Sequence, residues 1–150
     1  MTSSQGAARI HFFFDNVPPI LKSRQKLRNF IGYLFKKEGK RLVGLNYIFC
    51  TDQALLKINR RYLNHSFYTD VISFNLSDSA NEIIAEIYIS VDRLRDNAEK
   101  FKIPIREELH RVIFHGALHL CGYRDKRSSD KELMKQKEDA YLKDYFKCFT

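Results

Sequence analysis

The sequence predicts a single α+β domain, residues 1–150, in which a mixed four-stranded sheet packs against about five helices. Residues 9–50 follow the order strand, helix, strand, which predicts a right-handed crossover between parallel strands. The two strands expected within residues 70–89 are separated by a short gap, which favours an antiparallel hairpin. From residue 90 onward, apolar residues recur at helical spacing. Parallel and antiparallel strand pairs followed by helices indicate the α+β class.

The first elements are predicted from alternation, prolines and a capping residue. Residues 9–15 alternate so that one face of this strand is wholly apolar. Pro18-Pro19 are expected to start a helix, because proline is favoured in the first helical turn. A second strand is expected at residues 41–50. Thr51 is then a suitable N-cap for a helix over residues 52–63.

The two later strands differ in their patterns. Residues 70–76 alternate cleanly between apolar and polar side chains, which suits a strand at the edge of the sheet. Residues 83–89 are apolar almost throughout, which is typical of a central strand covered on both faces. Three helices should follow, beginning near Ser90, Pro104 and the capping box Ser129-Asp-Lys-Glu132.

The helix expected over residues 105–121 contains a candidate metal site. It is apolar on most sides, which is typical of a buried helix. His115 and His119 are four residues apart and leave the same face. Gly122 can end the helix in the left-handed conformation, so that the chain doubles back and brings Asp125 to both imidazoles. Two nitrogens and a carboxylate, with room left for water, form the ligand set of a catalytic metal site.

The alternative is that both histidines are core residues with separate hydrogen-bond partners. Each unmade hydrogen bond would cost about 1–3 kcal/mol, and a shared metal removes both costs at once. Glu108 lies on the same helical face, two turns before His115. We expect Glu108 either to accept a hydrogen bond from an imidazole N–H or to interact only with the helix dipole.

The histidine spacing is similar to that of zinc proteases, with one decisive difference. Gly116 stands where those enzymes have the glutamate that acts as general base, so proteolysis by that route is disfavoured. A metal held by His115, His119 and Asp125 can still supply a bound water for phosphodiester cleavage.

The positive charge of the chain is concentrated in one segment. Residues 20–41 contain eight Lys or Arg residues and a single acid, Glu38. Such a run is either a solvated helix face or a phosphate-binding stripe. A metal site favours the second interpretation, and therefore a nuclease. The candidate RNA-binding residues of this stripe are Lys22, Arg24, Lys26 and Arg28.

Composition limits the cellular context. No apolar run approaches the ~20 residues of a membrane span, and the first residues have no signal-peptide pattern. The three cysteines form no C-x-x-C motif, and their odd number argues against a disulfide framework. We expect a cytoplasmic protein with a disordered tail over residues 1–7.

The run His115-Gly-Ala-Leu-His-Leu-Cys-Gly-Tyr123 strongly resembles the motif of the YbeY family, bacterial metal-dependent endoribonucleases of ribosomal RNA maturation. Residues 59–60, 69–74 and 85–90 support the resemblance by their order and spacing. It implies strand order 2-1-4-3, with the third strand antiparallel at the edge. It also implies one zinc ion per chain bound by three motif residues, with manganese or nickel as alternatives. The expected partners are small-subunit ribosomal RNA and the ribosome, and the expected roles are rRNA processing and ribosome quality control.

Several positions depart from the family pattern. The third ligand, usually histidine, is Asp125, and Arg124 stands where the family has an acid before that ligand. The family's arginine in the loop before Thr69 is replaced by Leu63, and the usual Gly-Asp-Ile reads Ala85-Glu86-Ile87. We hypothesise that Arg124 takes over part of the RNA contact of that arginine. Two other functions remain as alternatives to the endoribonuclease. One is a non-catalytic RNA- or ribosome-binding assembly factor with a structural metal, and the less favoured one is a metallohydrolase of peptides or small molecules.

Overall fold

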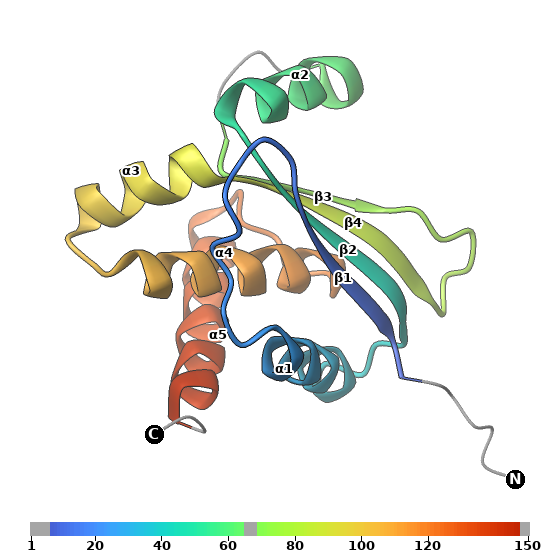
Figure 1. Ribbon diagram of the computed structural model, residues 1–150. Helices are drawn as coiled ribbons and strands as arrows, with labels where there is room; N and C mark the ends of the chain where they lie inside the picture. Colours follow the sequence, from blue (N-terminus) through green and yellow to red (C-terminus); the bar gives the residue numbers. More distant parts are fainter. Residues whose placement is uncertain (1–6, 65–68, 148–150) are drawn as a thin grey trace, which may run out of the picture.

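The computed structural model describes residues 7–64 and 69–147 and contains four strands and five helices within them (Figure 1). In chain order these are β1 (Arg9–Phe14), α1 (Arg24–Lys37), β2 (Leu42–Cys50), α2 (Asp52–Leu63), β3 (Val71–Asn75), β4 (Ile83–Ser90), α3 (Val91–Phe101), α4 (Ile105–Leu120) and α5 (Ser128–Lys147). The tail expected over residues 1–7 lies almost entirely outside the described residues. Across the described helices, none combines the length and the apolar character that crossing a membrane requires.

The four strands form one mixed sheet in the order β1-β2-β4-β3. β1, β2 and β4 are parallel, and β3 is antiparallel at the edge. The α+β class, the antiparallel edge strand and the central position of β4 are therefore confirmed. The expected order 2-1-4-3 is wrong, because β2 rather than β1 pairs with β4.

The burial of the two N-terminal strands explains this order. β2 has nine residues, and both of its faces are buried or half-buried, as a central strand requires. β1 has six residues, and its second face is open to solvent, with Phe13 49% exposed. Arg28 Nε donates a hydrogen bond to the carbonyl of Ile10 at 2.9 Å, so a side chain satisfies a carbonyl that β2 leaves unused. β1 is thus an edge strand.

The starts of α1 and α5 differ from the sequence-based expectation, whereas those of α2 and α3 agree with it. α1 begins at Arg24, not at Pro18-Pro19. Pro18 itself is disfavoured in the helical conformation because it precedes a proline. α5 begins at Ser128, which places Ser129 inside the helix. Thr51 and Ser90 are N-caps as expected, accepting hydrogen bonds from the backbone N–H groups of Ala54 and Arg93.

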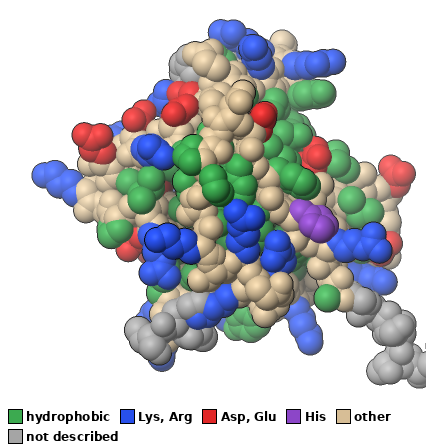
Figure 2. Space-filling view, viewed as in Figure 1, with side chains coloured by type: hydrophobic (Ala, Val, Ile, Leu, Met, Phe, Trp, Pro, Cys, Tyr) green, Lys and Arg blue, Asp and Glu red, His purple; other side chains and the backbone are tan. Residues whose placement is uncertain are grey.

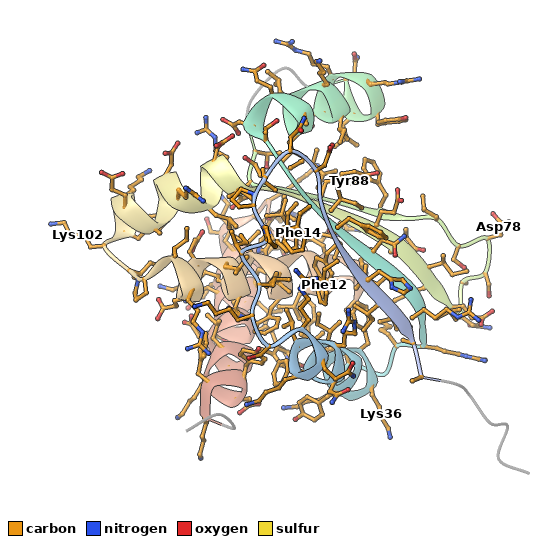
Figure 3. The ribbon with its side chains drawn as sticks, in the orientation of Figure 1. Phe12, Phe14, Lys36, Asp78, Tyr88 and Lys102 are labelled. Atoms are coloured by element: carbon orange, nitrogen blue, oxygen red, sulfur yellow. The ribbon has the colours of Figure 1, made fainter. Side chains whose placement is uncertain are left out.

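Helices cover the two faces of the sheet unequally (Figure 1). α1 and α4 pack on one face, and α5 crosses α4. α2 packs on the opposite face, over β3 and β4. Phe12 and Phe14 point from β1 toward the main core, and Tyr88 belongs to the smaller cluster under α2 (Figure 3). This arrangement places α4 between the sheet and α5.

Two hydroxyl groups of the sheet hold α4 in place. Tyr47 donates a hydrogen bond to the carbonyl of Ile113 at 3.0 Å, and Ser73 donates to the carbonyl of Gly116 at 3.1 Å. A Cβ atom at Gly116 would lie only 2.9 Å from Cγ2 of Ile87 and 3.2 Å from the Ser73 hydroxyl. Position 116 therefore faces the sheet, where a glutamate side chain has no room.

Gly116→Ala is expected to lower the free energy of unfolding by about 1–3 kcal/mol, because the added methyl group overpacks the contact between α4 and β4. Urea denaturation measures the change. The matched control is Gly32→Ala in α1, where a Cβ meets no atom within 4 Å. That control should be neutral or stabilising by up to ~1 kcal/mol. Equal stability of the two variants would contradict the close approach of position 116 to Ile87 and Ser73.

Candidate metal centre

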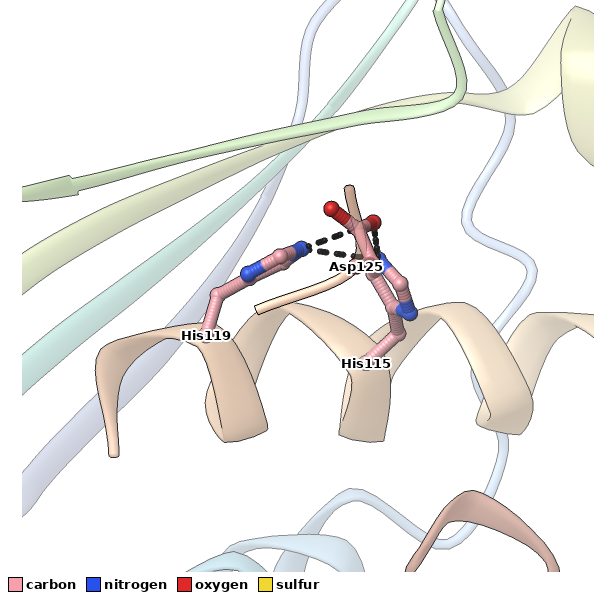
Figure 4. A group of neighbouring side chains, drawn as sticks. All are labelled: His115, His119 and Asp125. Atoms are coloured by element: carbon pink, nitrogen blue, oxygen red, sulfur yellow. Dashed lines mark hydrogen bonds and ion pairs between the residues drawn. The ribbon is translucent and has the colours of Figure 1, made fainter. Parts of the chain in front are cut away.

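The structure brings His115, His119 and Asp125 together on one side of α4 (Figure 4). The Nε2 atoms of the two imidazoles are 3.0 Å apart, and each lies 3.2 Å from Oδ2 of Asp125. Tetrahedral ligands at about 2.0–2.1 Å from a zinc ion are separated by about 3.3 Å. The three donor atoms thus converge at nearly the spacing that one bound ion requires, and the donor set suits a divalent metal.

The end of α4 is the local feature that turns Asp125 back toward the histidines. Gly122 has a φ of 104°, a conformation that glycine adopts without strain. The N–H of Gly122 donates to the carbonyl of His119 at 3.0 Å, and the N–H of Tyr123 donates to that of Leu118 at 3.1 Å. These two bonds define a Schellman motif. The expected glycine C-cap is therefore confirmed.

Each imidazole is oriented by a hydrogen bond from its other nitrogen. Nδ1 of His119 lies 2.9 Å from the carbonyl oxygen of Tyr123, which can only accept, so this nitrogen carries the proton. Nδ1 of His115 lies 2.5 Å from Oε2 of Glu138. Burial lowers the pKa of His115, but the hydrogen bond and charge of Glu138 outweigh this effect, and the pKa is raised overall. In the neutral rings both Nε2 lone pairs point into the cluster.

The acid that accepts a hydrogen bond from an imidazole N–H is Glu138, which was missed in the sequence, and not Glu108. Among the described residues, Glu108 forms no hydrogen bond with an imidazole: its Oε2 accepts one from Asn97 at 3.1 Å, and its Oε1 has no partner. The reason is distance, since Glu108 lies two helical turns, or about 10 Å, before His115. Glu138 comes instead from α5, which crosses α4. The sequence signal was an acid four residues from both Met134 and Leu142, on the buried face of α5.

The candidate RNA-binding residues at the start of the basic stripe lie away from the cluster. Arg24 and Arg28 stack over the rings of Phe14 and Phe12, at the β1 edge of the sheet. That edge is three strand spacings, or about 14 Å, from β3. Lys22 lines a cavity near the start of α4, and Lys26 belongs to the first turn of α1. Lys and Arg side chains gather in the lower half of the view in Figure 2, over α1 and the loop before it.

Other basic residues lie closer to the cluster. Arg124 precedes Asp125 directly and is exposed. Lys131 and Lys135, from the first turns of α5, line a cavity of about 600 Å³ together with His115 and Asp125. The sequence pointed to Arg124, but Lys131 and Lys135 were missed. These two lysines are four residues apart and follow the histidine motif. His65, in the loop after α2, is a reserve candidate for a metal ligand from the sequence, and it lies outside the described residues.

Asp70 is a further acid at this cavity, and it follows the threonine of the motif Thr69-Asp-Val. Burial raises the pKa of Asp70, and the charge of His115 only partly offsets the rise. Nδ2 of Asn97 donates a hydrogen bond to Oδ2 of Asp70 at 3.4 Å and another to Oε2 of Glu108 at 3.1 Å. Asn97 therefore links the two acids. Acids with raised pKa values beside a metal cluster are candidates for proton transfer.

The loop that contains Asp125 is fixed to α1 through Glu38. The hydroxyl of Tyr123 donates to Oε1 of Glu38 at 2.7 Å, the hydroxyl of Tyr141 donates to Oε2, and Lys137 Nζ lies 3.6 Å away. Burial raises the pKa of Glu38, but these hydrogen bonds and the Lys137 charge lower it further, so the net shift is downward. Glu38 therefore stabilises the folded protein as a carboxylate.

Glu38→Gln is expected to reduce stability near neutral pH and to have less effect in acid. Because the folded-state pKa lies below the ordinary pKa of a glutamate, the stabilising contribution is present above that ordinary value and is lost as pH falls through the folded pKa. Thermal unfolding of both proteins between pH 7 and pH 3 measures the difference. A stability gap that stayed constant over this range would show that the charge of Glu38 is not responsible.

Three comparisons with known proteins, by family model, by sequence and by structure, each find similar proteins. Residues 19–146 match the family model described as "Endoribonuclease YbeY". A protein of that name from Cytophaga hutchinsonii is 44% identical over 133 residues, which cover 89% of this chain and 93% of the relative. Another from Flavobacterium psychrophilum is 51% identical over 115 residues, covering 77% and 81%. The solution structure of a Thermotoga maritima protein matches with a TM-score of 0.59 and 25% identity, covering 91% of this chain and 89% of that one.

Proposed function

Because the chain belongs to the endoribonuclease YbeY family, we propose that it is a metal-dependent endoribonuclease of ribosomal RNA maturation, acting on small-subunit rRNA in the cytoplasm and in ribosome quality control. The observation that carries the proposal is the convergence of His115, His119 and Asp125 beside an open cavity. Structural metal sites are closed by protein ligands, whereas catalytic sites leave a position for water or substrate.

The residues of the site have distinct roles in this proposal. His115 and His119 would bind the ion through Nε2, and Asp125 through its carboxylate. We propose zinc as the native ion, with manganese or nickel as alternatives, because an oxygen ligand also suits harder ions. When bound, the ion supplies a Lewis acid and lowers the pKa of water. Glu138 and the carbonyl of Tyr123 hold the two rings in the binding orientation.

Phosphate contacts would come from the basic residues nearest the cluster. Arg124 is exposed beside Asp125, and Lys131 and Lys135 line the cavity. Their charges can stabilise the negative charge that develops on phosphate oxygens. The stripe of Lys22, Arg24, Lys26 and Arg28 would hold more distant parts of the RNA. If the Arg124→Ala variant cleaved RNA at the rate of the parent, a phosphate contact of Arg124 would be excluded.

Two alternatives are less favoured by particular observations. Proteolysis through a glutamate at position 116 is disfavoured because this position faces Ile87 and Ser73 of the sheet. An assembly factor with a structural metal is disfavoured by the cavity of about 600 Å³ that reaches His115 and Asp125.

The proposal is tested by incubating the purified protein with a small-subunit rRNA fragment. Cleavage should stop on addition of a chelator and return when a stoichiometric amount of zinc is restored. RNA binding without metal-dependent cleavage would favour the assembly factor instead.

A further inference from the structure

The cavity beside the metal cluster contains a buried carboxyl group with a free oxygen. Glu108 is 3% exposed, and its Oε2 accepts a hydrogen bond from Asn97. Its Oε1 is buried and has no hydrogen-bond partner among the described residues. Polar atoms buried in this way nearly always have a partner, because leaving one unpaired is costly. Within residues 7–64 and 69–147, this acceptor therefore remains available for a further donor.

The volume and the lining of the cavity suit a small ligand with an apolar face. Its volume of about 600 Å³ lies within the range of small-molecule sites, ~300–1,000 Å³. His115 and Asp125 line the same cavity as Glu108, and Val112 and Met134 add apolar walls. Phe101, also part of the lining, is 57% exposed and offers an aromatic face for stacking.

The net negative charge of the lining disfavours a phosphate beside Glu108. Five acids and three basic residues line the cavity. One of the basic residues, Arg111, is already paired with Glu138 at 3.0 Å and with Asp139 at 2.9 Å. The ligand group that fits here is uncharged and flat, with hydrogen-bond donors at its edge. A nucleobase has all of these properties.

Building on the proposed function, we propose that this cavity binds the base of a nucleotide next to the scissile phosphate, and that Glu108 selects bases carrying an amino group. Glu108 lies about 10 Å along α4 from His115, within reach of one nucleotide. Cytosine N4 and adenine N6 are donors that Oε1 can accept. Uracil presents a carbonyl oxygen where cytosine has its amino group, and this oxygen would face Oε1 without a shared proton. The site thus distinguishes two pyrimidines of equal size.

The test compares fluorescently labelled oligo(C) and oligo(U) of equal length, which have the same phosphate charge and need no assigned cleavage position. Binding to the metal-free protein is measured by fluorescence anisotropy, so that no cleavage occurs. The parent should bind oligo(C) at least about five-fold more tightly, since one good base contact gives this order of discrimination. Glu108→Leu should remove the preference by weakening oligo(C) alone. The matched control Glu99→Leu, an exposed acid of α3 outside the cavity lining, should retain it.

Two further measurements separate the possible failures. Glu108→Gln keeps the size of the side chain and should bring the preference toward unity, which covers the case that the leucine variant fails to fold. Equal binding of both oligomers by the parent, or a preference that persists in both Glu108 variants, would overturn the role of Glu108. If the metal-loaded protein cleaved neither oligomer nor rRNA but the binding preference remained, the proposed nuclease function would fail and the base site would stand.

Discussion

His119→Ala is expected to reduce the rate of RNA cleavage by about 10²–10⁴-fold. The variant loses one of three metal ligands, and the charge stabilisation that a bound metal supplies is worth several kcal/mol. Each 1.36 kcal/mol corresponds to a factor of ten in rate. The measurement is single-turnover cleavage of a small-subunit rRNA fragment at saturating protein, so that weakened RNA binding does not enter the rate.

The matched control for this variant is His11→Ala. His11 is exposed on β1, at the opposite edge of the sheet from β3, and should leave the cleavage rate unchanged. The pair also detects a contaminating nuclease, which would cleave equally in both preparations. Cleavage by pure His119→Ala within a few-fold of the parent would contradict the assignment of His119.

Glu138→Gln should weaken metal binding by about 10–100-fold, the usual effect of removing a partner that orients a histidine ligand. Oε2 of Glu138 accepts the hydrogen bond of His115 Nδ1, and its Oε1 accepts from Arg111. Glutamine keeps the size of the side chain but replaces one acceptor by a donor. Either His115 or Arg111 then faces a second donor. Competition with a chromophoric chelator measures the affinity.

The appropriate control is Glu132→Gln on the exposed face of the same helix. Its metal affinity should equal that of the parent. Because Arg111 keeps Asp139 as a partner, Glu138→Gln should remain folded, at a cost of about 1–3 kcal/mol. Unchanged metal affinity in a folded Glu138→Gln protein would show that His115 does not need this hydrogen bond to bind the ion.

The parts of the site that depend on local spacing could be predicted from the sequence. The i, i+4 pair His115 and His119, the glycine that ends α4, and the return of the chain to Asp125 all follow from helix geometry within eleven residues. The partner of His115 could not be found in this way. Glu138 lies 23 residues later, and its position depends on how α5 crosses α4.

The sheet illustrates the same limit. Alternation in residues 70–76 identified an edge strand, and a continuous apolar run identified a central one. The order of β1 and β2 was not fixed by such patterns, because both strands are rich in apolar residues. In the structure β2, with no exposed residue, lies between β1 and β4. The basic stripe was likewise visible as composition, but the position of Arg24 and Arg28 at the far edge of the sheet depends on the strand order.

The most direct test of the metal centre is the anomalous scattering of crystals of the zinc-loaded protein, recorded on both sides of the zinc edge. We expect one peak at about 2.0–2.2 Å from Nε2 of His115, Nε2 of His119 and a carboxylate oxygen of Asp125. A peak coordinated by both histidines and by His65 or water, with Asp125 turned away, would contradict the assignment of the third ligand. A peak elsewhere in the molecule would contradict the metal centre itself.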